Sequence, residues 1–254
     1  MLLFCGAAQA DGNARYVEIV REKPNCKTAE CFVEYMILPS GIAVKKQIDT
    51  AAEDAPARMS VRKFPDASSL FAHVTAFFAG SRGSGSRTND PENIFFYDGE
   101  KFYSYGSPDP DAPAYLALFR EADEAFEKGT PASDFYTHVY YTPAKGNTKD
   151  FHVFSDGTVI ASMFGKDTYM IIYTFVSATD AAEVATLRQL GTAAVKAKAS
   201  DYKKCAPASG LDYGFVEMRI DGSYIRSYTC GDEADSVALL LNHIRGTFDG
   251  LQPK

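Results

Sequence analysis

The chain has 254 residues, of which 46% are hydrophobic and 23% are charged, and its formal net charge is −7. This composition is that of a folded globular protein, and the length suits one large domain or two ordinary ones. An acidic chain without a lysine or arginine cluster lacks the charge pattern of a nucleic-acid-binding protein, so we expect no nucleic-acid partner. No stretch reaches the ~18 apolar residues that a membrane span needs.

The first residues have the features of the end of a secretory signal. Ala8-Gln9-Ala10 has the small-x-small form that signal peptidase recognises, and a polar segment starts at Asp11. We therefore interpret residues 1–10 as the remnant of a signal whose true start lies upstream, and we expect a periplasmic or secreted protein. The alternative is a short apolar N-terminus that packs or frays.

The predicted elements then follow one order twice. The first pass has a strand over 16–21, a hairpin over 31–38 and 42–48, a strand over 59–64, a helix over 66–78, a hairpin over 94–105 and a helix over 113–128. The second has a strand over 135–141, a hairpin over 150–154 and 158–164, a strand over 169–176, a helix starting near Ser177 or Thr179, a hairpin over 215–220 and 223–229, and a helix over 233–248. We interpret them as a tandem duplication of a β-β-β-β-α-β-β-α unit, with units over 11–130 and 131–254. The alternative is a coincidence of a common α+β pattern.

Tight turns define the predicted fold class. Glycine follows serine or aspartate at Ser40-Gly41, Asp98-Gly99, Asp156-Gly157 and Asp221-Gly222, and we expect a two-residue turn at each pair. Runs of strands broken by single amphipathic helices predict an α+β fold with antiparallel sheets and helices packed on one face. In the last hairpin, the turn places Ile220 opposite Ser223 and Glu217 opposite Arg226, the latter as an exposed ion pair.

Cysteine usage agrees with export. Four cysteines remain when Cys5 leaves with the signal, and four cysteines allow three pairings. We favour Cys26–Cys31 and Cys205–Cys230, because an oxidising compartment would keep such bridges closed. Four free thiols are the alternative, and the spacings do not match those of compact structural zinc sites.

No residue pattern predicts a catalytic, cofactor or metal site. His138 and His152 lie on neighbouring predicted strands, but a metal site would need a third ligand such as Asp150 or Asp156, and no motif supplies one at a recognisable spacing. The glycine- and serine-rich segment over 80–87 lacks the features of a phosphate loop or a nucleophile turn. We therefore expect no enzyme, no cofactor and no metal.

Aromatic residues on both faces of the predicted hairpins suggest an interaction surface, because large exposed aromatic patches mark interfaces. Alternatively, the two units cover each other's sheets. The residues of this candidate surface are Phe95, Phe102, Tyr103, Tyr105, Tyr140 and Tyr141.

These observations together favour an exported, non-enzymatic protein that binds a protein partner through a sheet surface. A periplasmic immunity or inhibitor protein is the most concrete form of this hypothesis. The alternatives are a protein that binds a small apolar ligand and an enzyme of unrecognised type. An oligomeric state is not predicted.

Overall fold

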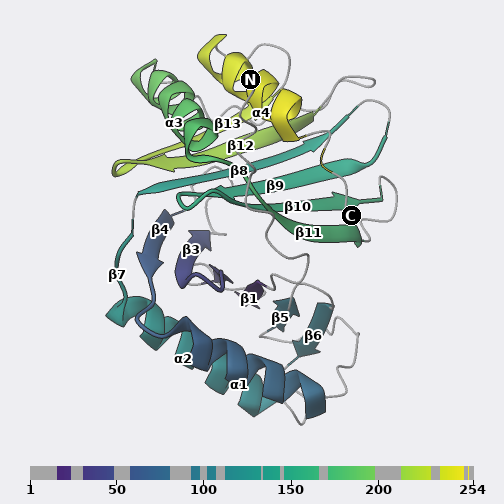
Figure 1. Cartoon of the computed structure of the whole chain (residues 1–254). Coiled ribbons are helices and arrows are strands. Elements are labelled where there is room, and N and C mark those ends of the chain that lie inside the picture. Colours follow the sequence, from purple (N-terminus) through teal and green to yellow (C-terminus); the bar gives the residue numbers. More distant parts are fainter. Residues whose placement is uncertain are drawn as a thin grey trace, which may run out of the picture. The chain divides into compact units, whose positions relative to one another are not determined.

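The computed structural model describes residues 16–23, 31–48, 58–80, 93–97, 102–106, 112–132, 134–143, 146–165, 171–197, 213–229, 235–248 and 251. Within these residues the protein has an α+β fold with two antiparallel sheets and four helices, as the sequence predicts (Figure 1). None of the four helices combines the length and apolar character that a membrane span requires.

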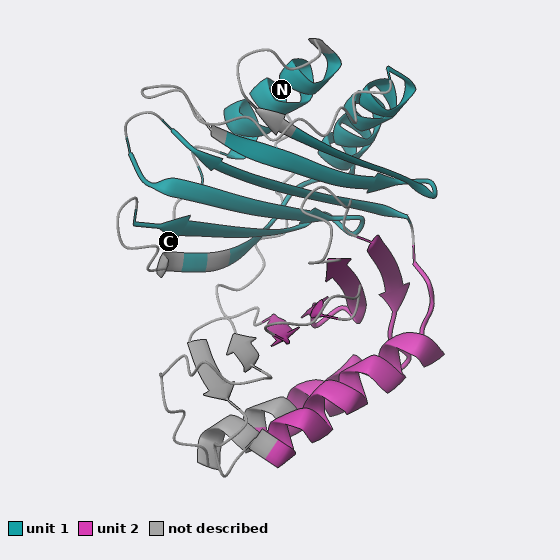
Figure 2. Ribbon diagram, turned by 180° about the vertical axis from the view of Figure 1, so that it is seen from behind, with its two compact units in different colours: residues 1–13, 134–254 teal, residues 14–133 magenta. Residues whose placement is uncertain are grey.

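The chain divides into two compact units (Figure 2). The N-terminal unit spans residues 14–133, and the C-terminal unit spans residues 134–254, with which residues 1–13 are grouped. The sequence-based boundaries, with units over 11–130 and 131–254, stay predictions.

The N-terminal unit contains one sheet and two helices. Its elements are β1 (Val17–Glu22), β2 (Phe32–Ile37), β3 (Ile42–Ile48), β4 (Arg58–Lys63), α1 (Ala67–Gly80), β5 (Asn93–Tyr97), β6 (Phe102–Gly106), α2 (Ala112–Lys128) and β7 (Thr130–Pro131). The sheet has the order β6-β5-β1-β2-β3-β4-β7, so the two-residue strand after α2 pairs with β4 at one edge.

The C-terminal unit also contains one sheet and two helices. Its elements are β8 (Phe135–Thr142), β9 (Thr148–Phe154), β10 (Thr158–Phe164), β11 (Ile171–Ala178), α3 (Ala181–Lys196), β12 (Tyr213–Ile220), β13 (Ser223–Thr229) and α4 (Asp235–Phe248). The strand order is β11-β10-β9-β8-β12-β13.

The two units share their element order and their sheet order. Each contains the predicted order β-β-β-β-α-β-β-α, followed in the N-terminal unit by β7. Counted from the first strand of each unit, the N-terminal sheet reads 6-5-1-2-3-4 before β7, and the C-terminal sheet reads 4-3-2-1-5-6. The second order is the first one read from the opposite edge.

In each unit the helices contribute to a core on one face of the sheet. In the C-terminal unit, alternate strand residues such as Val139, Val153 and Val216 pack with helix residues such as Leu187 and Leu240. The N-terminal core is built in the same way, with strand residues packed against residues of α1 and α2. Alternation of side chains along a strand leaves the intervening residues on the other face, and that face carries the candidate site described below.

The predicted two-residue turns are wrong at two of the hairpins. Gly157 has φ +85° and donates its N–H to the Phe154 carbonyl oxygen at 3.0 Å, so three residues connect β9 to β10. The Asp156 carboxylate accepts the Thr158 N–H at 3.0 Å, which favours this wider turn. Gly41, also at φ +85°, donates to the Leu38 carbonyl oxygen at 2.9 Å.

The Asp221-Gly222 turn follows the prediction. Both residues have positive φ, at 46° and 82°, as a two-residue type I′ turn requires. The resulting pairing sets Ile220 opposite Ser223 and Glu217 opposite Arg226, as predicted. The Asp98-Gly99 turn lies outside the described residues.

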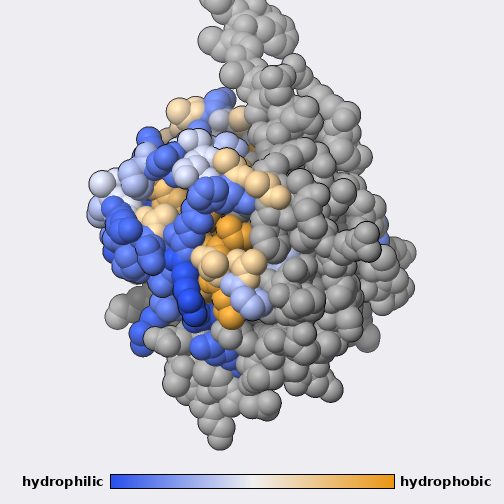
Figure 3. Space-filling model, turned by 90° about the horizontal axis from the view of Figure 1, so that it is seen from below, coloured by the Kyte–Doolittle hydropathy of each residue, from blue (hydrophilic) through white to orange (hydrophobic). Residues whose placement is uncertain are grey.

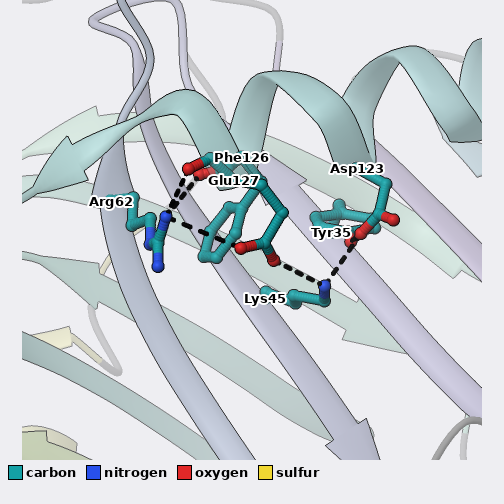
Figure 4. Close-up of polar contacts among 6 residues, drawn as sticks. All are labelled: Tyr35, Lys45, Arg62, Asp123, Phe126 and Glu127. Atoms are coloured by element: carbon teal, nitrogen blue, oxygen red, sulfur yellow. Dashed lines mark hydrogen bonds and ion pairs between the residues drawn. The ribbon is translucent and has the colours of Figure 1, made fainter.

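A polar network fixes α2 on the N-terminal sheet (Figure 4). The Asp123 carboxylate accepts hydrogen bonds from Lys45 Nζ at 2.8 Å and from the Tyr35 hydroxyl. Arg62 donates to the carbonyl oxygens of Phe126 and Glu127, at 3.1 and 2.7 Å, and thereby satisfies carbonyls that the end of a helix leaves without intrahelical partners.

The solvent side of α2 is polar. Its exposed residues include Arg120, Glu124 and Lys128, while Tyr115 and Phe119 face the core. Among the residues that carry a colour in Figure 3, which shows the molecule from below, hydrophilic ones predominate beside a narrower strip of hydrophobic ones. This amphipathic pattern is that of a helix packed on a sheet.

Candidate metal centre

The cysteines predicted to form disulfides lie mostly outside the described residues. Cys31 is buried and disulfide-bonded. Cys26, Cys205 and Cys230 lie outside the described residues, so the pairings Cys26–Cys31 and Cys205–Cys230 stay predictions.

The predicted aromatic surface is described only at its last two residues. Tyr141 is 3% exposed and packs into the helix-side core against Phe151, so it is not available to a partner in this structure. Tyr140 is half-buried and stacks on Phe215 with ring centroids 5.4 Å apart. The side chains of Phe95, Phe102, Tyr103 and Tyr105 lie outside the described part of the chain.

The structure brings together two histidines from neighbouring strands. His138 on β8 lies directly opposite His152 on β9, and the imidazole rings stack with centroids 4.2 Å apart and planes 13° apart. Both residues lie on the face away from α3 and α4, because their strand neighbours Val139, Phe151 and Val153 belong to the helix-side core. Both are nonetheless buried, with 8% and 6% exposure.

Asp150 joins the two histidines. One carboxylate oxygen lies 2.8 Å from His138 Nε2 and 3.3 Å from His152 Nε2. Asp150 lies two residues before His152 on β9, so strand alternation places both side chains on the same face. Among the described residues these three side chains form one group in which the possible ligand atoms all lie within 4.8 Å of one another.

The histidines set the protonation of Asp150. Burial alone would raise the pKa of the Asp150 carboxyl, but the charges and hydrogen bonds of His138 and His152 outweigh burial and hold this pKa below its usual range. The carboxylate is therefore ionised at neutral pH and available as a hydrogen-bond acceptor or as a metal ligand.

The other nitrogen of each imidazole has its own partner. His138 Nδ1 lies 3.3 Å from a Glu217 carboxylate oxygen, and His152 Nδ1 lies 2.7 Å from the Tyr136 hydroxyl. These contacts orient both rings so that the Nε2 atoms face Asp150. In proteins that bind metals, ligating histidines are held in this way by a group on the second ring nitrogen.

The arrangement fits the donor set of a metal ion. Two imidazole nitrogens and one carboxylate oxygen are typical ligands of zinc and of other first-row transition metals. A tetrahedral ion about 2.0–2.1 Å from each donor sets the donors about 3.3 Å apart. The Asp150–His152 separation of 3.3 Å matches this value, whereas the Asp150–His138 separation of 2.8 Å is that of a hydrogen bond.

The sequence-based prediction of no metal rested on spacing. The sequence places His138 and His152 on neighbouring predicted strands and offers Asp150 or Asp156 as a possible third ligand. The structure brings Asp150 to the histidines, whereas the exposed Asp156 binds the backbone of its own turn. Glu217 was predicted to form an exposed ion pair with Arg226; the pair is present at 3.2 Å, but Glu217 is 0% exposed.

Comparisons of this chain with models of known protein families and with curated proteins found no match.

Proposed function

We propose that the C-terminal unit binds a divalent transition-metal ion through His138, Asp150 and His152. The observation that carries this proposal is the convergence of both Nε2 atoms on one Asp150 oxygen, while both Nδ1 atoms have hydrogen-bonding partners. Imidazole nitrogen favours zinc, copper, iron or nickel, whereas magnesium and calcium prefer oxygen ligands.

A charge-balanced network without a metal is the competing explanation. Asp150 and Glu217 each carry a negative charge, and Arg226 and a doubly protonated His138 would balance them. This network requires an N–H on both nitrogens of His138, whereas a metal ion replaces the proton on Nε2. Metal binding therefore releases protons, and the competing network binds no ion.

Equilibrium dialysis of the full chain against zinc tests the proposal. The protein is first stripped with a chelator and kept without reductant, so that disulfide-bonded cysteines do not bind the ion. We expect one zinc ion per chain, lost in His138→Ala and in Asp150→Asn. His73→Ala removes an exposed histidine from α1 and should retain the ion. Absence of zinc binding, or equal binding by all variants, would refute the proposal.

We also infer that the two units arose by duplication. The hairpin glycines support this origin, because the Gly41 oxygen accepts the N–H of Phe64 and the Gly157 oxygen accepts the N–H of Thr179. In each case the donor is the first residue after the fourth strand of its unit.

The last helices give independent support for duplication. The buried residues of α2 and α4 correspond at a constant offset of 122 positions, and both helices end with an N–H donated to a phenylalanine carbonyl oxygen three residues earlier, at Phe126 and Phe248. The corresponding buried pairs are Tyr115 and Val237, Leu118 and Leu240, Phe119 and Leu241, Ala122 and Ile244, and Phe126 and Phe248.

The sequence-based hypothesis of an exported, non-enzymatic protein that binds a protein partner stays a prediction beside the metal proposal. The two are compatible, since a metal ion in the C-terminal unit leaves the rest of the surface for a partner. Recovery of a stoichiometric protein from periplasmic extract on the immobilised chain would support this hypothesis. Native mass spectrometry showing a retained small molecule and no protein would favour the alternative of a small apolar ligand.

A further inference from the structure

The two candidate histidine ligands belong to a row of polar residues on four neighbouring strands of the C-terminal sheet. His152 on β9 lies opposite His138 on β8, which lies opposite Glu217 on β12, which lies opposite Arg226 on β13. Four neighbouring strands thus contribute four consecutive members of one row. Cross-strand neighbours are close enough for their side chains to interact, so the row connects Arg226 to the histidines through Glu217.

Glu217 occupies the centre of this row and is 0% exposed. One carboxylate oxygen accepts from the Tyr224 hydroxyl and from Arg226 Nη1, both at 3.2 Å. The other oxygen lies 3.3 Å from His138 Nδ1. A buried carboxylate is costly unless it is paired and hydrogen-bonded, and these three donors offset that cost.

Glu217 contacts the side of His138 that faces away from the proposed ion. His138 Nε2 points to Asp150, whereas Nδ1 points to Glu217. A carboxylate acceptor on Nδ1 keeps the proton on that nitrogen, leaves the Nε2 lone pair for a metal and makes the imidazole a stronger ligand. His152 has an uncharged phenol, Tyr136, at the corresponding position, which provides less of this effect.

We infer that Glu217 is a positioning residue that tunes the metal affinity of the centre through His138. This inference rests on the proposed metal site and extends it by one residue that would not itself touch the ion. It makes His138 the stronger of the two nitrogen ligands, and it makes metal affinity depend on the pairing of β12 with β8.

The test compares the zinc dissociation constant of the full chain with that of Glu217→Gln. Glutamine keeps the shape and an acceptor oxygen for Arg226 but removes the charge facing His138. We expect the dissociation constant to rise about 10- to 100-fold, the usual cost of losing an outer partner of a metal-bound histidine. Tyr136→Phe should cost less. Glu127→Gln removes an ion-paired carboxylate from the N-terminal unit and should leave the constant unchanged.

Nitrogen-15 NMR of the zinc-bound wild type provides a readout that does not depend on the folding of a variant. We expect His138 to carry its proton on Nδ1, with a proton resonance further downfield than the corresponding resonance of His152. Equal affinities of the wild type and Glu217→Gln, or a His138 proton on Nε2 in the zinc-bound protein, would refute the role of Glu217 while leaving the metal site intact. A wild type that binds no zinc would refute both.

Discussion

The two sheets share the order of their first six strands but differ at the row that contains the candidate histidine ligands. Where β8 and β9 set His138 opposite His152, the corresponding strands β1 and β2 set Glu18 opposite Met36. The correspondence follows from the hairpin glycines, since Met36 and His152 each lie five residues before the glycine of the following turn. The fold therefore does not require a histidine pair at this position, because the N-terminal sheet forms with a buried methionine there.

The polar networks of the two units differ in a second respect. In the N-terminal unit, Lys45 and Tyr35 meet Asp123 between the sheet and α2, so the docking of a helix explains them (Figure 4). In the C-terminal unit, His138, Asp150 and Glu217 lie on the face away from the helices, so the docking of a helix does not account for these polar residues. Lys46 of β3 is also buried on the face away from the helices of the N-terminal unit, so the contrast lies in the clustering of two histidines with two carboxylates on that face of the C-terminal unit.

The largest effect is expected when a histidine of the C-terminal sheet is replaced by the residue at the corresponding position of the N-terminal sheet. His152→Met removes one proposed ligand and introduces the residue found at Met36. We expect the zinc dissociation constant to rise more than about 100-fold, beyond the usual effect of an outer residue, because a direct ligand is lost. Isothermal titration calorimetry measures the constant, and circular dichroism checks that the variant is folded. Unchanged affinity would remove His152 from the site.

The hairpin glycines provide the next test of the comparison. At Gly157 a side chain would collide with the Thr179 carbonyl oxygen, whereas at Gly41 the nearest atom is the Phe64 carbonyl oxygen, 3.2 Å from an added Cβ. Both positions also require positive φ, which costs a non-glycine residue about 1–2 kcal/mol. Gly157→Ala should therefore reduce the free energy of unfolding by more than Gly41→Ala, as measured by urea denaturation. The reverse order would contradict the closer contact found at Gly157.

The pH dependence of stability should reveal the contribution of Asp150 to the C-terminal unit. Its pKa in the folded protein lies below the ordinary value of 3.8. A carboxyl whose pKa is lowered by folding stabilises the folded protein. This stabilisation is complete at pH values above the pKa in the unfolded chain, and it is lost as pH falls through the pKa in the folded protein. We expect the metal-free wild type to lose its advantage over Asp150→Asn as pH falls below about 3.8. Parallel unfolding curves for the two proteins would contradict the role of the histidines.

The smallest effect is expected at the contacts between helices. His73 on α1 contacts Glu121 on α2 at 2.8 Å, and Glu183 on α3 contacts His243 on α4 at 2.7 Å. These contacts are at least partly exposed, so His73→Gln or His243→Gln should change the free energy of unfolding by less than about 1 kcal/mol. Thermal denaturation measures this change, and a larger loss in one unit alone would indicate that its helix pair depends on the contact.

Local patterns predicted the architecture well. The Asp221-Gly222 turn correctly set Glu217 opposite Arg226, because a two-residue turn fixes the register of its hairpin. The same rule was wrong at Asp156-Gly157, where the aspartate side chain bonds to the turn backbone and only the glycine adopts positive φ. Helix faces such as Val237, Leu240 and Ile244 followed from their spacing.

The candidate site could not be assembled in the same way. The connection between β8 and β9 carries no two-residue turn signal, so the sequence did not set His138 opposite His152. Glu217 reaches His138 across 79 residues of chain, and no local pattern predicts that β12 pairs with β8. The burial of Glu217 was also missed, because an alternating strand pattern suggested that the face away from the helices is exposed.

Anomalous diffraction at the zinc edge, from crystals of the full chain grown with zinc, tests the central proposal most directly. We predict one anomalous peak about 2.0–2.2 Å from the Nε2 atoms of His138 and His152 and from an oxygen of Asp150. A zinc-free site in which Asp150 still bridges the two histidines, with any anomalous peak elsewhere in the molecule, would contradict it.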